Sequence, residues 1–419
     1  MFSANTSQVS EDRLYVEDVF STYLYTGNGS TQTITNGIDL AGKGGLVWMK
    51  DRVASSYGNH ILVDTVQTPA GSYLKTNSTD AAASSGFITF NSNGFYLPGN
   101  SAVNISGNAT ASWTFRKAPK FFDVVTYTGN GTFVRQINHS LGVTPGFIVV
   151  KRTDSTGNWM CVHRNNPMGE LVLNSSNANT GNTDNIEVWT STYIGVSNAA
   201  NTNGATYVAY LFAHDTTSDG IIQCGSYTGN GSSTGPTVTL GWEPQWLLVK
   251  SATSGAPWRL MDVMRGLSET SSFFLDPSLS DAETPNQGAQ LIPAATGFRI
   301  ASTSSALNSN GQTYIYIAIR RGPMRTPTTG TSVFAPVART GTGTVTNVTA
   351  GFAPDLHISF DRSANAYPAW YDRLRGVFKS LKSNSTAAEV SDTVSLAEFN
   401  NTGSEVWNDG TNGSINFNG

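Results

Sequence analysis

Two short motifs place a carboxylate and a guanidinium close enough together to act on one ligand. Asp262-Val263-Met264-Arg265-Gly266 and Asp372-Arg373-Leu374-Arg375-Gly376 each follow an aromatic run, with the arginine three residues after the aspartate. Such a pair can bind a sugar hydroxyl or a phosphate. The alternative is that the two side chains pair across a tight turn closed by the glycine, and recurrence of the motif favours this architectural role. Asp262 and Asp372 are therefore candidate ligand-binding residues, without any predicted catalysis.

Three tryptophans form a second set of candidates, because aromatic faces on β-sandwiches stack on sugar rings. Trp159, Trp258 and Trp370 are predicted to occupy one corresponding position of a repeat, and Trp48 and Trp246 another. Repetition at one register is also what core packing predicts. The alternative that these side chains fill the interior of each repeat is therefore favoured.

Other chemistry is not indicated by residue spacing. The histidines His60, His139, His163, His214 and His357 stand singly, without a second ligand at metal spacing. Acidic residues are sparse and spread along the chain, whereas glycoside hydrolysis needs two opposed carboxylates. Phosphate-binding glycine loops of the Gly-x-x-x-x-Gly-Lys-Ser/Thr type are absent from the sequence. We therefore expect no catalytic residues, no metal, no cofactor and no enzymatic activity.

Composition limits the partners. The net charge is −4 and Lys and Arg are scattered, so nucleic acid is not an expected partner. No apolar run approaches the roughly 20 residues of a membrane span, and Met1 to Ser10 lacks the pattern of a signal peptide. We expect a soluble protein made without secretion. Cys161 and Cys224 are expected to be buried thiols rather than a disulfide.

The chain is a tandem repeat of whole domains. The motif Tyr25-Thr26-Gly27-Asn28-Gly29 recurs at Tyr127 and at Tyr227, and a degenerate copy starts at Thr340. A period of about 100 residues means domains rather than solenoid rungs. The predicted boundaries are an arm at 1–19 and repeats at 20–118, 119–217, 218–325 and 326–419. Because Asn-Gly accepts positive φ, the motif is predicted to run from a strand into a tight hairpin.

Short apolar runs bounded by Gly, Asn or Ser predict the fold. The runs recur in the same order in each repeat, and they indicate tandem antiparallel β-sandwich modules with little helix. The fourth repeat stops at Gly419, where the others begin their final aromatic strand. A sheet edge without that strand is rarely tolerated. Either the natural chain continues or another chain completes the sheet, and we expect continuation.

The combination of motifs resembles a known group of proteins. Tyr-Thr-Gly-Asn-Gly is joined by Leu-Gly-x-x-Pro at Leu141 and Leu240, by apolar strands that end in Lys, and by the run Tyr314–Arg320. This set is similar to repeats in virion structural proteins of tailed bacteriophages, particularly the tail-fibre-like proteins of marine phages. The resemblance covers nearly all of the chain from Phe20 onward. It implies a non-enzymatic particle component whose modules look like lectin-type β-sandwiches. The fourth repeat departs most, with Arg339 where Tyr would stand.

The leading hypothesis is a tail-fibre or tail-associated structural protein located in the virion and assembled in the host cytoplasm. The N-terminal arm would attach to other virion proteins, and the modules would form a rigid rod that presents loops to host-surface glycans. A homo-oligomer is expected, with a trimer favoured, because fibres usually trimerise. The alternatives are a capsid decoration or cement protein and a polysaccharide-degrading enzyme on a sandwich scaffold. A bacterial adhesin is disfavoured by the missing secretion signal.

Overall fold

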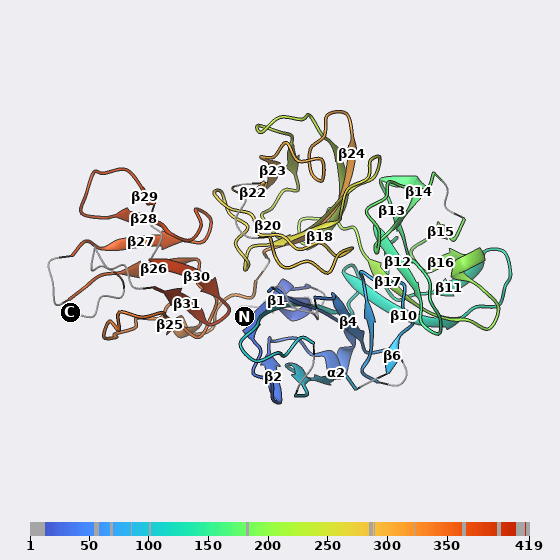
Figure 1. The fold of residues 1–419 in the computed structure, drawn as a ribbon, viewed down its shortest axis with the longest axis horizontal. Helices are drawn as coiled ribbons and strands as arrows, with labels where there is room; N and C mark the ends of the chain where they lie inside the picture. Colours follow the sequence, from blue (N-terminus) through green and yellow to red (C-terminus); the bar gives the residue numbers. More distant parts are fainter. Residues whose placement is uncertain are drawn as a thin grey trace, which may run out of the picture.

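The protein is described by a computed structural model that covers residues 13–53, 58–67, 70–84, 86–99, 102–181, 184–284, 288, 290–322, 324–362, 366–391, 395–407 and 415. Its elements are antiparallel strands and single helical turns, which confirms the predicted all-β sandwich-type fold (Figure 1). The helical turns in this part of the chain are α1 (Val16–Val19), α2 (Leu40–Lys43), η1 (Asn198–Ala200) and η2 (Gly330–Ser332). None of the described helices is long and apolar enough to cross a bilayer.

Four modules follow one another along the chain. Module 1 contains β1 (Phe20–Thr26), β2 (Gln32–Thr35), β3 (Gly45–Asp51), β4 (Ile61–Asp64), β5 (Ser72–Lys75), β6 (Ala83–Ser84), β7 (Thr89–Asn91), β8 (Gly94–Leu97) and β9 (Ala109–Arg116). Module 2 contains β10 (Phe122–Thr128), β11 (Arg135–Asn138), β12 (Phe147–Arg152), β13 (Trp159–His163), β14 (Asn166–Val172), β15 (Ile186–Trp189), β16 (Tyr193–Val196) and β17 (Thr206–Phe212).

The remaining two modules have fewer described strands. Module 3 contains β18 (Ile222–Thr228), β19 (Thr237–Thr239), β20 (Pro244–Ser251), β21 (Arg259–Asp262), β22 (Leu291–Ala294), β23 (Gly297–Ile300) and β24 (Thr313–Arg320). Module 4 contains β25 (Thr346–Thr349), β26 (Leu356–Ser359), β27 (Ala369–Asp372), β28 (Lys379–Lys382), β29 (Val390–Ser391), β30 (Leu396–Asn400) and β31 (Gly403–Val406).

Each module pairs a larger sheet with a three-stranded sheet. The larger sheets have the orders β1-β9-β3-β4-β5-β6, β10-β17-β12-β13-β14, β18-β24-β20-β21 and β26-β27-β28-β29. In modules 1 to 3 the first and last strands of the module are therefore neighbours at one edge. The larger sheet of module 4 has neither of these two strands among the described residues. Alternate side chains of each larger sheet, such as Val47 and Met49 in module 1, pack on the smaller sheet and form the module's own core.

The Tyr-Thr-Gly-Asn-Gly motif connects the two sheets, so the predicted tight hairpin is wrong. β1 pairs with β9, whereas β2 pairs with β8 in the other sheet. The turn is instead held by the segment before the last strand. Tyr25 donates to the Val103 carbonyl at 2.8 Å, and Asn104 Oδ1 accepts from the Asn28 amide at 3.0 Å. Modules 2 and 3 repeat both bonds with their own residues.

Modules 1, 2 and 3 pack around a common centre through the outer faces of their larger sheets (Figure 1). Trp48 of module 1, Trp159 of module 2 and Trp246 of module 3 belong to the same buried cluster. The cavity left where the three modules meet measures only about 10 Å³, so the centre is closely packed. The expectation of an extended rod is therefore wrong for these modules, because their outer faces are too apolar to remain apart in water.

The N-terminal segment is partly built into this body. Residues 1–12 of the predicted arm lie outside the described residues. Residues 13–19 are placed, and Val16 and Val19 of α1 are 1% and 0% exposed within the common centre. Arg325, which follows module 3, pairs with Asp18 at 2.7 Å. The described part of the arm therefore packs on modules of its own chain.

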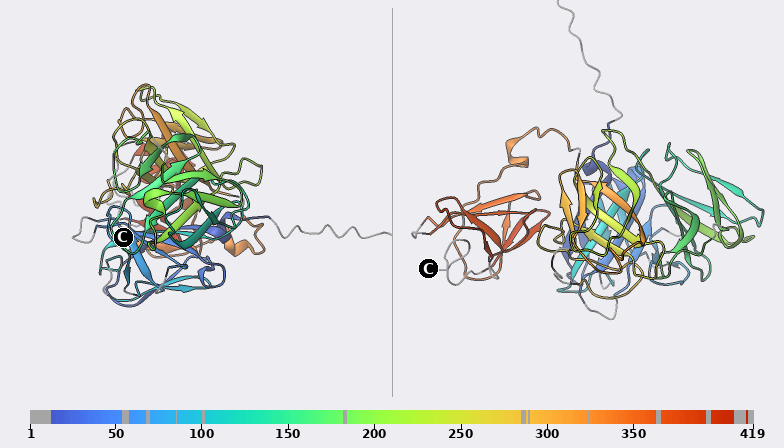
Figure 2. Two further views of the ribbon diagram at one scale, coloured as in Figure 1. Left: turned by 90° about the vertical axis from the view of Figure 1, so that its right-hand side faces the viewer. Right: turned by 90° about the horizontal axis from the view of Figure 1, so that it is seen from above.

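Module 4 lies beside the other three modules rather than among them (Figures 1 and 2). Asn401 Oδ1 accepts from the Leu24 amide of β1 at 2.9 Å, and Arg373 pairs with Glu243 of module 3 at 3.1 Å. Polar side chains thus tie module 4 to the outer edges of modules 1 and 3. Its apolar outer sheet face does not take part in the common centre.

Candidate functional site

The Asp-x-x-Arg-Gly motif of module 3 forms a buried turn, as its architectural interpretation predicts. Arg265 Nε lies 2.6 Å from Asp262 Oδ2, and the Arg265 amide donates to Asp262 Oδ1 at 2.9 Å. The guanidinium also donates to the Leu260 carbonyl at 3.0 Å. Both charged side chains are 0% exposed. Asp262 is therefore fully engaged inside the protein and is not accessible to a ligand in solution.

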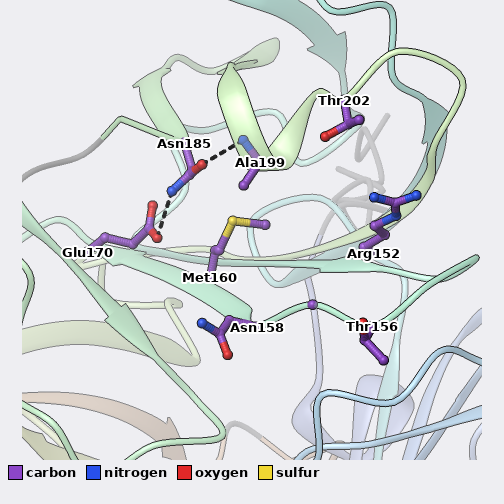
Figure 3. Close-up of a pocket in the computed structure, with 9 residues that line it drawn as sticks. Arg152, Thr156, Asn158, Met160, Glu170, Asn185, Ala199 and Thr202 are labelled. Atoms are coloured by element: carbon purple, nitrogen blue, oxygen red, sulfur yellow. Dashed lines mark hydrogen bonds between the residues drawn. The ribbon is translucent and has the colours of Figure 1, made fainter.

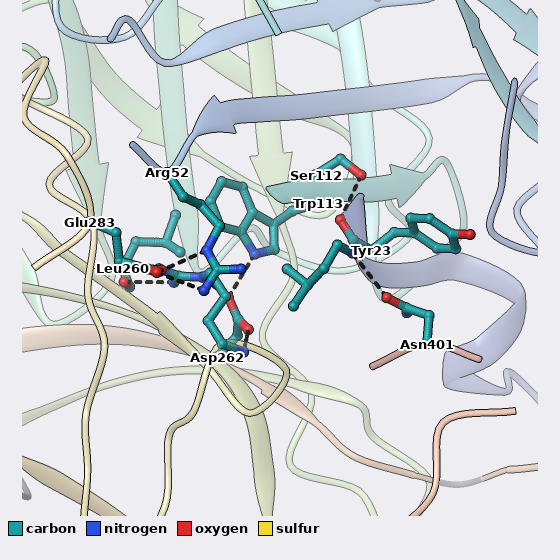
Figure 4. Close-up of polar contacts among 10 residues, drawn as sticks. Tyr23, Arg52, Ser112, Trp113, Leu260, Asp262, Glu283 and Asn401 are labelled. Atoms are coloured by element: carbon teal, nitrogen blue, oxygen red, sulfur yellow. Dashed lines mark hydrogen bonds and ion pairs between the residues drawn. The ribbon is translucent and has the colours of Figure 1, made fainter. Parts of the chain in front are cut away.

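The same turn joins module 3 to module 1 (Figure 4). Trp113 Nε1 of β9 donates to Asp262 Oδ2 at 3.0 Å, across the boundary between the modules. Glu283 then bridges the two modules, because its carboxylate pairs with Arg265 and with Arg52, each at 2.8 Å. The charges in this cluster compensate one another, which a buried ion pair requires if it is not to destabilise the fold.

Module 4 repeats this turn at a more exposed site. Arg375 pairs with Asp372, and the Arg375 amide donates to Asp372 Oδ1 at 2.8 Å. Glu389 takes the place of Glu283 and lies 3.1 Å from Arg375 Nη1. The side chains of Asp372 and Arg375 are 31% and 20% exposed, and no neighbouring module donates an indole to this carboxylate within the described chain.

The Asp262 joint belongs to a cyclic set. The strands β4, β13 and β21 each pair with the central strand of their module, β3, β12 or β20. This pairing aligns Asp64, His163 and Asp262 at one position of the three modules. Asp64 accepts from Tyr210 of module 2 at 2.7 Å, and His163 Nε2 lies 3.1 Å from the Tyr316 carbonyl of module 3. Together with the Trp113 bond, these contacts run from module 1 to 2, from 2 to 3 and from 3 back to 1.

Main-chain bonds repeat the same cycle. The Ala82 amide donates to the Thr153 carbonyl at 2.8 Å, which joins modules 1 and 2. The corresponding bonds run from Asn179 to Ala252 at 2.9 Å and from Glu283 to Arg52 at 2.9 Å. Each acceptor stands two residues after the lysine of its central strand. Three equivalent joints therefore close the modules into a ring with approximate three-fold symmetry.

Two of the three candidate tryptophans are interior joint residues. Trp159 and Trp258 are 0% and 1% exposed. Trp159 Nε1 donates to the Lys75 carbonyl of module 1 at 3.0 Å, and Trp258 Nε1 donates to the Val172 carbonyl of module 2 at 3.1 Å. Burial against a neighbouring module leaves neither ring face free for a sugar. The favoured interior interpretation is correct for these two residues, although the space that they fill lies between modules.

The predicted correspondence of the tryptophans is wrong in two cases. Trp370 pairs with Ile358, whereas Trp159 pairs with the strand-terminal Lys151, so Trp370 stands two positions further along its strand. Trp48 pairs with Leu62, whereas Trp246 pairs with Asp262, so these two are also displaced by two positions. The error arose because alternate positions on a strand face the same side. Trp370 is 36% exposed.

A pocket of about 210 Å³ lies between the two sheets of module 2, at one end of the sandwich (Figure 3). Polar side chains dominate its lining: Arg152, Thr156, Asn158, Glu170, Asn185 and Thr202, with Met160 between them. Asn185 Nδ2 donates to Glu170 Oε1 at 3.0 Å, and Asn185 Oδ1 in turn accepts from the Ala199 amide at 2.9 Å. The pocket thus holds one oriented carboxyl group among neutral and cationic donors.

The carboxyl group of Glu170 has an unusually high pKa. It is 4% exposed, and its Oε2 has no hydrogen-bond partner among the described residues. Burial raises the pKa of Glu170 to about 7, although the bond from Asn185 opposes the shift. A carboxyl group with such a pKa can donate or accept a hydrogen bond near neutral pH.

Module 2 differs from modules 1 and 3 at one position that lines the pocket. Strand pairing aligns Leu74, Leu171 and Leu275 in the three modules, so the residues before them, Tyr73, Glu170 and Phe274, correspond. Tyr73 packs on Phe87 with ring centroids 4.5 Å apart, and Phe274 lies under Arg259 at 4.0 Å. Glu170 replaces an aromatic ring with a smaller side chain, which leaves space in the sandwich.

No metal centre is formed by the residues that are described. No three His, Cys, Asp or Glu side chains in this part of the chain lie close enough to hold one ion. Burial lowers the pKa of His163 to about 3 and that of His357 to about 4, so both rings are neutral at physiological pH. Cys161 and Cys224 are free and buried, as predicted.

Most of the joint residues and the pocket were missed by sequence reasoning. No local motif singles out Trp113, Tyr210 or Asp64, and only the fold brings them to module boundaries. Glu170 had a usable signal, because it is an acidic residue next to the aliphatic run Leu171-Val172-Leu173 where repeats 1 and 3 have the aromatic residues Tyr73 and Phe274. Recognising that signal required an alignment of the repeats at β5, β14 and the run that contains Phe274.

A family model matches most of the chain. A search of curated proteins found no match to the chain. A family model described as a domain of unknown function, DUF7483, matches residues 16–323 and 329–419, which include all four modules. The family model thus covers the ring, the pocket and module 4 together. The chain belongs to the DUF7483 family.

Proposed function

We propose that the chain is a non-enzymatic structural protein of a bacteriophage particle, in a tail fibre or a tail-associated position. The resemblance of its repeats to those of phage virion proteins supports this proposal. The observation that carries it is the cyclic joint, in which Asp64, His163 and Asp262 each hold a neighbouring module. Residue types that could serve catalysis are here buried in contacts that make the body rigid.

Host attachment through glycans is the second part of the proposal. The module 2 pocket offers guanidinium, amide, hydroxyl and carboxyl groups in a volume of about 210 Å³, which suits a single sugar ring. Of the candidate tryptophans, Trp370 alone has an exposed fraction, 36%, that leaves part of its ring available for stacking. We assign primary glycan contact to the pocket because its polar groups converge.

The virion assignment is tested on particles. Antibodies raised against the purified chain are used for gold labelling of intact phage that encode it, with pre-immune serum as the control. Label on tail fibres is the expected result. Label over the capsid surface would favour the alternative of a decoration protein, and particles without label or matching peptides would overturn the assignment.

The glycan assignment is tested on an array of host-surface sugars. Glu170→Tyr restores the aromatic side chain of modules 1 and 3 and is expected to abolish binding by filling the pocket. Asp219→Asn is the control, because Asp219 has a 61% exposed side chain and is not part of the pocket lining. Equal binding by both variants would exclude the pocket. Turnover of a host polysaccharide would instead support the alternative of an enzyme.

A further inference from the structure

Module 4 and the ring do not share an apolar core, whereas the three ring modules do. The buried apolar residues of module 4, such as Val348, Tyr371 and Phe399, form a cluster of their own. The cluster at the centre of the ring contains no residue from the described part of module 4. Domains that lack a large hydrophobic interface are free to move relative to each other. Module 4 can therefore separate from the ring without opening a common core.

Asn401 connects module 4 to the edge of module 1 (Figure 4). Its Oδ1 accepts from the Leu24 amide at 2.9 Å, and its Nδ2 donates to the Thr22 carbonyl at 2.8 Å. The side-chain amide thus takes the place of a neighbouring strand beside β1, whose other edge pairs with β9. Water can replace both bonds when module 4 moves away, so they oppose separation only weakly.

A turn of module 3 makes a second polar contact with module 4. The Glu269 amide donates to the Leu374 carbonyl at 2.9 Å, and the Thr270 hydroxyl donates to the Arg375 carbonyl at 2.8 Å. Both acceptors belong to the Asp-x-x-Arg-Gly turn of module 4. This contact also consists of groups that water can satisfy after separation.

Four charged side chains of alternating sign complete the joint. Arg373 of module 4 lies 3.1 Å from Glu243 of module 3 and 2.9 Å from Asp355 of its own module. Arg321, at the end of module 3, pairs with the same two carboxylates. The side chains of Arg321, Glu243 and Asp355 are 30%, 21% and 56% exposed. Dissolved ions therefore reach and screen these four side chains, which are called the joint ion pairs below.

The segment between modules 3 and 4 has the properties of a hinge. All residues from 324 to 334 are exposed, and Figure 2 shows this segment, with η2, looping outward between the ring and module 4. Residues 324–328 also fall between the two stretches that the family model matches. Exposed connections of this kind can absorb the change in backbone angles when a domain turns.

We propose that module 4 is a reversibly docked arm, which turns away from the ring as a folded unit about residues 324–334 while the ring stays closed. The joint ion pairs set the balance between the docked and the released arrangement, and added salt shifts this balance towards release. In the released arrangement, module 4 and the ring can face different surfaces. The proposal concerns this joint alone and does not depend on the virion assignment.

Amide hydrogen exchange of the full chain tests the proposal, because single amides report on each joint. The amides of Leu24 and Glu269, called the arm amides, donate to module 4. The amides of Ala82 and Asn179, called the ring amides, donate across boundaries within the ring. Raising the NaCl concentration from about 20 mM to about 1 M should speed exchange of the arm amides at least about tenfold and change the ring amides less than about twofold.

Glu243→Gln removes one carboxylate of the joint ion pairs and leaves the sequence of module 4 unchanged. At about 20 mM NaCl its arm amides should exchange at least about fivefold faster than those of the original chain, and salt should add less to that rate. Glu389→Gln is the matched control, because Glu389 also pairs with two cations, Arg375 and Lys379, but both belong to module 4. The arm amides of the control should exchange as in the original chain.

Each alternative gives a different exchange pattern. Arm amides that do not respond to salt would show that module 4 is fixed on the ring. Equal acceleration of the ring amides would show that the whole molecule loosens, and faster exchange within β30 and β31 would show that module 4 unfolds instead of turning. Equal behaviour of Glu243→Gln and Glu389→Gln would exclude the joint ion pairs. Each of these results would overturn the proposal.

Small-angle X-ray scattering measures the release directly. The radius of gyration of the original chain should increase between low and high salt, and that of Glu243→Gln should already be larger at low salt. A radius that stays constant while the arm amides exchange faster would contradict the turning of module 4 as a unit.

Discussion

The Tyr210 hydroxyl of module 2 donates a 2.7 Å hydrogen bond to the Asp64 carboxylate of module 1. Neither residue is exposed, and Gln67 donates to the same oxygen of Asp64 at 2.6 Å. Burial raises the pKa of Asp64, and the two hydrogen bonds oppose that shift. The carboxylate thus accepts hydrogen bonds from both sides of a module boundary. Substitutions at such a joint should therefore change the free energy of unfolding.

Replacement of Trp113 by phenylalanine is predicted to weaken the joint between modules 1 and 3. The substitution removes the 3.0 Å bond to Asp262 and leaves a buried carboxylate with one donor fewer. Loss of a hydrogen bond to a charged group, together with a small void, should reduce the free energy of unfolding by about 2–4 kcal/mol. Denaturant unfolding measures this loss.

Trp48→Phe is the matched control for this variant. Trp48 pairs directly with Trp113, and its Nε1 donates at 3.0 Å to neutral His60 inside module 1. The same volume is lost, but the bond does not cross a joint. Amide hydrogen exchange of residues 262–266 should become faster in the Trp113 variant and not in the Trp48 variant. Equal acceleration in both variants would contradict a role of Trp113 in the joint.

The two copies of the Asp-x-x-Arg-Gly turn are predicted to respond differently to the same change. Asp262→Asn removes one of the two buried carboxylates that pair with Arg265, leaves Glu283 as its remaining acidic partner, and should cost about 3–5 kcal/mol of stability. Asp372→Asn should cost less than about 1 kcal/mol, because solvent reaches its partially exposed partner. Chemical denaturation of the two variants provides the comparison. Similar losses would show that burial does not set the energetics of the turn.

Glu170 is predicted to make stability depend on pH. Its pKa is about 7 in the folded protein, above the ordinary value of 4.5, so the folded state binds the proton more tightly than the unfolded state. The stabilisation is complete below pH 4.5 and is lost as the pH rises through about 7. Across this window the wild type should lose up to about 3 kcal/mol relative to Glu170→Gln. Denaturation curves at several pH values test this, and parallel pH profiles would contradict it.

The two thiols are predicted to be inert in the folded protein. Cys161 and Cys224 are both 0% exposed, and burial raises the pKa of each thiol. A disulfide reagent such as dithionitrobenzoate should react with neither on the time scale of minutes, and with both after denaturation. Thr331→Cys adds a thiol at an exposed position and serves as the positive control. Rapid reaction of the unaltered protein would show that the ring opens.

The sequence predicted the modules better than their arrangement. Apolar runs such as Phe147–Lys151 carry the strand pattern locally, so fold class and repeat order followed from them. The Tyr-Thr-Gly-Asn-Gly turn was misjudged because its geometry depends on Asn104, which is distant in sequence. The ring was not predicted because an apolar outer strand face looks the same whether a neighbouring module or another chain covers it.

The candidate site was only partly predictable for a similar reason. The pairing of Asp262 with Arg265 follows from three-residue spacing and is confirmed, together with its counterpart at Asp372. Trp159 and Trp258 gave a correct interior prediction, although nothing local showed that they contact modules 1 and 2. The pKa of Glu170 is raised by burial, and its burial depends on both sheets of the sandwich.

Covalent linkage of the three ring modules has an evolutionary consequence. A ring of three identical subunits carries every substitution three times, so a change that suits one place must be tolerated at all of them. Here each third of the ring can vary alone, and dilution cannot separate the thirds. Glu170 illustrates this freedom, because the ring keeps aromatic packing at Tyr73 and Phe274 and opens a pocket once per molecule.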